Sequence, residues 1–134
     1  MLKIPVTVLA VVEIIMGVLT IIAWLEHIKG IKAEAWAPEG WAKYIKSIIW
    51  PDMLMIVTLF VSGCLLLTGN PMGLKLSLAA GGMLLYLCLL VGSYNIQNRL
   101  YPSNKGGFSF ILADTIVGVV GVFVTYGGLT TTMG

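Results

Sequence analysis

The chain has 134 residues, of which 58% are hydrophobic and only 10% are charged. Soluble domains carry about 25% charged residues, so this composition argues against a water-soluble fold. Eight basic and six acidic residues leave a net charge of +2, and no basic cluster suited to nucleic acid is present in the sequence. We therefore expect an all-α integral membrane protein that forms a single domain over residues 1–134.

Four apolar segments follow one another along the chain. A transmembrane helix needs about 20 apolar residues to cross a hydrocarbon core of about 30 Å. The second apolar run, 53–68, is short for this, so its helix is expected to extend back to Ile48 with a break or entry turn at Pro51. The first is expected to be a retained helix, because it is longer than a signal-peptide core and lacks a small-residue cleavage pattern. We predict a four-helix transmembrane bundle with helices over residues 4–25, 48–68, 74–95 and 108–129.

The sequence Gly69-Asn70-Pro71 separates the second and third apolar segments. Glycine commonly follows the last turn of a helix, and proline disfavours helical geometry at the residue before it. We predict that the second and third helices form a tight antiparallel hairpin.

Residues 26–50 form the longest connection and mix aromatic, lysine and apolar side chains. Such a mixture is typical of the membrane–water interface. We expect an amphipathic interfacial segment of one or two short surface helices, interrupted near residues 38–40. The expected interfacial anchors are Trp24, Trp36, Trp41, Tyr44 and Trp50.

Six of the eight basic residues lie in the first and third loops, which share one side of the membrane if four helices cross it. The positive-inside rule places such loops in the cytoplasm. The expected localisation is a multi-pass membrane protein with both termini outside.

Two acidic residues interrupt the predicted spans. An ionised side chain near the middle of a bilayer is costly, so Glu13 and Asp114 are expected to face the bundle interior. Each acid begins a stripe of small, polar or aromatic residues on its own helix. The stripes are Glu13, Gly17, Thr20, Trp24 and His27 on the first helix, and Asp114, Gly118, Gly121, Thr125 and Gly128 on the fourth.

The third predicted helix carries a stripe of its own, formed by Gly82, Tyr86, Ser93 and Gln97. Small residues let neighbouring helices approach closely. The expected helix-packing glycines are Gly17, Gly82, Gly118 and Gly121.

The polar residues of the spans gather mainly towards loops one and three, and three interpretations of them stay open. A protonated Glu13 could fix packing by hydrogen bonds to Tyr86 or to serine and threonine. A cavity open to one face could bind a small polar or quinone-like ligand. Glu13 and Asp114 could also be stations for protons or cations, although a depth difference of about 9 Å at 1.5 Å per residue argues against a directly paired diad. The residues of the predicted cavity are Glu13, Thr20, Tyr86, Tyr94, Asn95 and Asp114.

Donors for metal or redox chemistry are few. His27 is the only histidine, and a zinc site would need two or three further donors, so we expect no metal site. Cys64 and Cys88 are expected at depths about 12 Å apart, which exceeds the roughly 7 Å limit between the Cα atoms of a disulfide. No cofactor is evident, apart from a quinone or lipid that a polar cavity would take, and no catalytic residue is assigned.

The layout resembles the DoxX-like membrane proteins. The resemblance lies in a short chain with four spans, a longer first loop, a tight second hairpin, and Pro51-Asp52 leading into Leu-Leu-Leu-Thr-Gly-Asn-Pro-Met-Gly at residues 65–73. It implies a subunit of a quinol- or thiol-linked oxidoreductase. The family commonly has a basic residue early in its first helix, where Glu13 stands here, so the resemblance assigns no catalytic residue.

These features predict a small accessory or structural subunit of a larger membrane complex, a respiratory or oxidative one. Its partners would be membrane lipids and other membrane protein subunits, or further copies of itself. One alternative is a stand-alone small-molecule or quinone-binding protein with a Glu13/Asp114 cavity. Another is a homo-oligomeric transporter coupled to protons or ions. No catalytic site of its own is expected.

Overall fold

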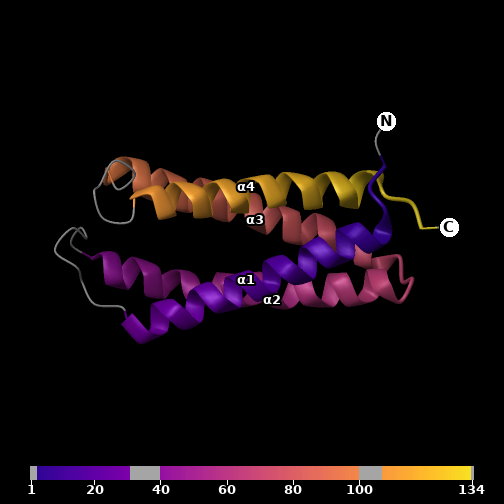
Figure 1. Cartoon of the computed structure of the whole chain (residues 1–134), viewed down its shortest axis with the longest axis horizontal. Coiled ribbons are helices and arrows are strands. Elements are labelled where there is room, and N and C mark those ends of the chain that lie inside the picture. The colour runs from indigo at the N-terminus through magenta and orange to yellow at the C-terminus, as the bar shows by residue number, and fades with distance from the viewer. Residues whose placement is uncertain (1–2, 31–39, 100–106, 134) are drawn as a thin grey trace.

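The structure is a computed structural model and describes residues 3–30, 40–99 and 107–133. Its described residues are all-helical, as the sequence predicts, and form four helices (Figure 1). Each helix contains a stretch long and apolar enough to cross a membrane. The helices are α1 (Val6–Gly30), α2 (Trp41–Leu67), α3 (Met72–Gln97) and α4 (Gly107–Thr130).

The helices pack mainly with their neighbours along the chain, and α1 also contacts α4. The start of α1, the end of α4 and the turn between α2 and α3 lie at the same end of the bundle (Figure 1). At that end the buried Thr131 hydroxyl donates a hydrogen bond to the Ile4 carbonyl, with an O···O distance of 3.0 Å. This bond closes the bundle by joining the two ends of the described chain.

The turn between α2 and α3 confirms the predicted hairpin. Gly69 has a φ of 80°, a left-handed conformation that glycine adopts without steric cost. The backbone N–H of Asn70 donates to the Leu65 carbonyl at 2.9 Å, and that of Gly69 donates to the Leu66 carbonyl at 3.1 Å. This pair of bonds is the Schellman arrangement that satisfies the last carbonyls of a helix.

Helix α2 differs from its prediction. It begins at Trp41 instead of residue 48 and continues through Pro51 without a break, so the predicted break was wrong and residues 41–50 belong to α2. Proline removes only its own donor and crowds one preceding carbonyl. Packing on both sides of Pro51 outweighs that local cost, because Ile48 and Asp52 are both buried.

The structure describes only part of the rest of the predicted first loop. Helix α1 extends to Gly30, five residues past the predicted end, because loss of apolar character marks the end of a span and not of a helix. The left-handed Gly40 directly precedes α2, at the edge of the predicted interruption. The remainder of that interruption, with Trp36, lies outside the described residues.

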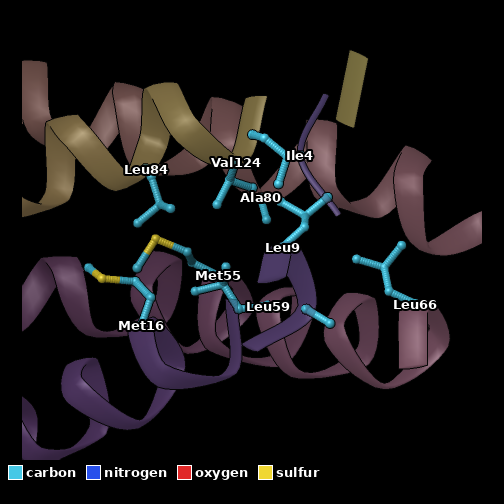
Figure 2. Packing of buried hydrophobic residues seen from close by; sticks show 10 residues of the cluster. Ile4, Leu9, Met16, Met55, Leu59, Leu66, Ala80, Leu84 and Val124 are labelled. Carbon is cyan, nitrogen blue, oxygen red and sulfur yellow. The ribbon is translucent and has the colours of Figure 1, made fainter. Parts of the chain in front are cut away.

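A core of apolar side chains from all four helices fills the middle of the bundle (Figure 2). Leu9, Leu59, Leu84 and Val124, one from each helix, are fully buried. The outward surfaces of the same helices are also apolar, with Val119, for example, 63% exposed. A water-soluble protein rarely exposes apolar surface so continuously, and the pattern suits an apolar surrounding.

Three of the four predicted helix-packing glycines lie against a neighbouring helix. A Cβ added at Gly17 would lie 3.1 Å from the Phe60 ring, and one at Gly118 would lie 3.0 Å from the Cys88 sulfur. At Gly121 it would lie 3.1 Å from the Leu85 backbone nitrogen. Such close neighbours show that these glycines let helices approach.

Gly82 is the exception, and its predicted packing role was wrong. A Cβ at Gly82 would meet nothing within 4 Å, whereas one at Gly81 would lie 2.8 Å from the backbone nitrogen of Thr125 on α4. Consecutive residues of a helix point about 100° apart. The sequence offers two adjacent glycines, and only the rotation of α3 within the bundle selects Gly81.

Candidate functional site

Glu13 lies in the interior of the bundle, as predicted, and is 0% exposed. Its Oε2 lies in hydrogen-bond contact with the Ser62 hydroxyl oxygen of α2 at 2.7 Å, while its Oε1 is buried without a hydrogen-bond partner among the described residues. Leu9 and Ala10 one turn before it, and Met16 one turn after it, are buried in the apolar core. The carboxyl group is therefore enclosed between apolar layers.

Ser62 connects the acid to α3. Its Oγ lies 2.9 Å from the Ser77 Oγ and 3.2 Å from the Gly73 carbonyl, and Ser77 also donates to that carbonyl at 2.9 Å. We call Glu13, Ser62, Ser77 and the Gly73 carbonyl the serine cluster. It joins three helices through side-chain oxygens and is fully buried.

A second group of polar residues lies nearer to the other end of the helices. The rings of Tyr44 and Tyr94 stack with centroids 3.7 Å apart and an interplanar angle of 8°. The Asn95 amide donates to Asp114 Oδ2 at 3.0 Å. We call Tyr44, Tyr94, Asn95 and Asp114 the tyrosine cluster; the Tyr44 hydroxyl is buried and has no hydrogen-bond partner within the described part of the chain.

A buried pair between α1 and α2 lies beside this cluster. The Trp24 indole N–H donates to Asp52 Oδ2 at 2.7 Å. Both Asp52 and Asp114 are close enough to Tyr44 for their charges to act on its hydroxyl. All four helices thus bring acids and aromatic rings together at this level.

The residues of the predicted cavity are distributed over separate places. Tyr94, Asn95 and Asp114 come together in the tyrosine cluster, but Glu13 lies apart from them in the serine cluster. Thr20 donates to the Met16 carbonyl of its own helix at 2.8 Å. Tyr86, the predicted partner of Glu13, is 68% exposed. The structure therefore does not bring these six residues into one cavity, because they differ in depth and α3 turns Tyr86 outward.

The sequence did not single out Ser62 and Ser77. Each is an isolated hydroxyl in an apolar run, which is also common where a serine only bonds its own helix. Tyr44 was identified, but as an interfacial anchor, and Asp52 only as part of the resemblance to the DoxX-like proteins. Their contacts with Trp24 and Tyr94 depend on how different helices face one another.

The predicted interfacial anchors differ in how far they are buried. Trp24 is only 7% exposed and packs in a core cluster with Ile48 and Ile56. Tyr44 is half-buried against Tyr94, whereas Trp50 is 79% exposed. The position of Trp36 and the side chain of Trp41 lie outside the described residues.

The described part of the chain offers few side chains for metal or thiol chemistry. No group of three His, Cys, Asp or Glu residues is placed there to hold a metal ion, and the side chain of His27 is outside it. Cys64 is an exposed free thiol and Cys88 a half-buried one. The two thiols are not joined to each other.

The predicted polar stripe of α3 points outward, so it does not face the bundle. Tyr86, Leu89, Ser93, Ile96 and Gln97, which we call the α3 outer face, are all exposed. The last four of these line a shallow groove of about 460 Å³ together with Cys88 and Gly92. Comparison with protein families, with curated proteins and with solved structures gives no match for this chain.

Proposed function

We propose that the four helices cross a membrane and that the protein is a small subunit of a larger membrane assembly, whose neighbouring subunit covers the α3 outer face. The observation that carries this proposal is the exposure of Tyr86 on that face. Tyr86 is 68% exposed, and it is the 15th of the 26 residues of α3. At 1.5 Å per residue its Cα lies roughly 16 Å from the nearer helix end, deep in a hydrocarbon layer.

Polar groups at that depth favour a protein neighbour over lipid. A hydroxyl without a hydrogen-bond partner costs several kcal/mol in hydrocarbon, on the order of 2–7 kcal/mol. Nearer the end of α3, Gln97 donates a bond of 3.3 Å to Ser93 on the same face. A helix of another subunit in the groove would supply acceptors and bury Leu89 and Ile96, as polar side chains commonly do between transmembrane helices.

The resemblance to DoxX-like proteins supports an oxidative or respiratory assembly. The positive-inside rule supports cytoplasmic loops one and three. The exposed Lys43, Lys46 and Trp50 on the first turns of α2 suit the headgroup level at that side.

Site-specific photo-crosslinking in the native membrane tests the subunit proposal. A benzophenone amino acid at Tyr86 is expected to capture one polypeptide, and native mass spectrometry of gently extracted protein is expected to show that polypeptide at fixed stoichiometry. The matched control is Val119, which is 63% exposed near the middle of α4 and is expected to capture only lipid. Capture of lipid alone at Tyr86, or only of a second copy of this chain, would overturn the proposal.

The tyrosine cluster favours a second function, the binding of a quinone-like ring. Its stacked rings offer a flat aromatic surface, and the buried Tyr44 hydroxyl is a donor that meets no acceptor among the residues that the structure describes. A quinone carbonyl would be such an acceptor, and small-molecule sites commonly combine aromatic walls with a few placed polar groups.

Calorimetric titration with a short-chain benzoquinone tests this function. Tyr44→Phe is expected to weaken binding about tenfold, because it removes a hydrogen bond of about 1.4 kcal/mol. Tyr86→Phe changes an exposed tyrosine outside the tyrosine cluster and should bind like the wild type. Equal binding by the wild type and Tyr44→Phe, or no binding by either, would refute a quinone site here.

A further inference from the structure

The ionisation state of Glu13 in the serine cluster can be argued independently of the proposed subunit role. Glu13 is buried at 0% exposure, and only Ser62 and Ser77 act on its carboxyl apart from burial itself. Among the described residues it forms no ion pair. An ionised carboxylate without a cationic partner is very costly in an apolar interior, so a buried acid in such a place is neutralised.

The charged side chains on the surrounding elements do not supply that neutralisation. Lys3 precedes α1 and Lys75 is on the first turn of α3, and both are exposed. The acid of α4, Asp114, accepts from Asn95 in the tyrosine cluster. On α2, Asp52 accepts from Trp24, ten residues before Ser62. The positive charge that neutralises the Glu13 carboxylate must therefore come from outside the described residues.

The oxygens of the serine cluster show which cation fits. They form a chain of three short contacts: Glu13 Oε2 to Ser62 Oγ at 2.7 Å, Ser62 Oγ to Ser77 Oγ at 2.9 Å, and Ser77 Oγ to the Gly73 carbonyl at 2.9 Å. Every such contact needs one hydrogen atom between its oxygens. The two serine hydroxyls supply two hydrogens, and the carbonyl supplies none. A proton on Glu13 supplies the third, and the longer separation of 3.2 Å between Ser62 Oγ and the Gly73 carbonyl then holds no hydrogen.

We propose that Glu13 is a proton-binding site of the folded protein. With the proton on the carboxyl, Glu13 donates to Ser62, Ser62 donates to Ser77, and Ser77 donates to the Gly73 carbonyl. When the proton leaves, Ser62 must turn and donate to the carboxylate, so the three contacts share only two hydrogens and one of them is lost. The bound proton therefore holds α1 against α2 and α3, and its release weakens that junction.

Infrared difference spectroscopy in detergent at pH 7 tests this assignment. The carbonyl stretch of a protonated carboxyl is expected in the wild type and is expected to disappear in Glu13→Gln. The same band should persist in Asp52→Asn and Asp114→Asn, which change the other two acids within the four apolar stretches that could cross a membrane. Ser62→Ala keeps the acid but removes its acceptor, so it should shift the band without abolishing it. If Glu13→Gln does not fold, this shift is the test of whether the band belongs to Glu13.

The pH dependence of stability gives a second readout. A proton that is bound in the folded state and released on unfolding stabilises the protein, and that stability is lost as the pH rises. Over the range in which this linkage acts, the folding constant of the wild type is expected to fall up to tenfold per pH unit, by 2.303RT per proton. Glu13→Gln carries no titrating proton and should lack this component. A wild-type spectrum without a Glu13 carboxyl band, or equal pH dependence in the two proteins, would overturn the proposal.

Discussion

Gly81→Ala is expected to destabilise the protein by about 2–3 kcal/mol, the usual range for overpacking a close-packed interior. The new Cβ would lie 2.8 Å from the backbone nitrogen of Thr125 and 3.0 Å from its Cα. These atoms belong to the backbone of α4, so no side-chain rotation can relieve the contact. Helices α3 and α4 would have to separate along their interface.

The neighbouring glycine provides the control for this change. Gly82→Ala adds the same methyl group to the same helix, but its Cβ meets nothing within 4 Å. It should be neutral or stabilising by up to about 1 kcal/mol, because alanine favours a helix more than glycine does. Thermal unfolding of both variants in detergent measures the difference. Similar losses from both variants would contradict the α3–α4 packing described here.

Trp24→Phe should cost about 2–3 kcal/mol. Trp24 is 7% exposed, and its indole N–H donates at 2.7 Å to Asp52, which is also 7% exposed. Phenylalanine removes that donor from a buried acceptor and also leaves a void where the second ring was. Losing a hydrogen bond to a charged or buried group costs about 1–3 kcal/mol, to which the lost packing adds.

Trp50→Phe is the matched change on an exposed tryptophan. Trp50 is 79% exposed, so its replacement should change the free energy of unfolding in detergent by less than about 0.5 kcal/mol. Intrinsic fluorescence during chemical unfolding measures both variants against the wild type. If Trp50→Phe were the more damaging of the two, Trp24 would not be the interior residue that the structure describes.

The sequence predicts the helices well because their signals are local. Apolar length identifies four helices, and Gly69-Asn70-Pro71 identifies the hairpin, since a left-handed glycine and a proline act on the backbone within a few residues. The break at Pro51 was wrong for a related reason. A proline has a local cost, but the contacts of Ile48 and Asp52 that offset it come from other helices.

The stripes on α1 and α4 face the bundle, whereas the predicted stripe on α3 faces outward. Glu13 and Asp114 fix the inward side of their helices, because burying a polar group away from lipid has a large free-energy benefit. Helix α3 carries no acid, and its tyrosine and amide can sit beside a partner subunit as well as inside. Its inward side is set by Gly73, Ser77, Gly81 and Leu84, which all lie against neighbouring helices.

The sequence by itself determined the all-α class, the four apolar helices, the tight hairpin and the inward direction of Glu13, because these follow from local composition and from the cost of a buried charge. Only the tertiary structure decided that Glu13 meets Ser62 and Ser77, and that Tyr94, Asn95 and Asp114 meet Tyr44 elsewhere. Those pairings depend on the rotation and depth of each helix relative to its neighbours. Such relations are set by packing between residues distant in sequence, which the spacing along any single helix does not contain.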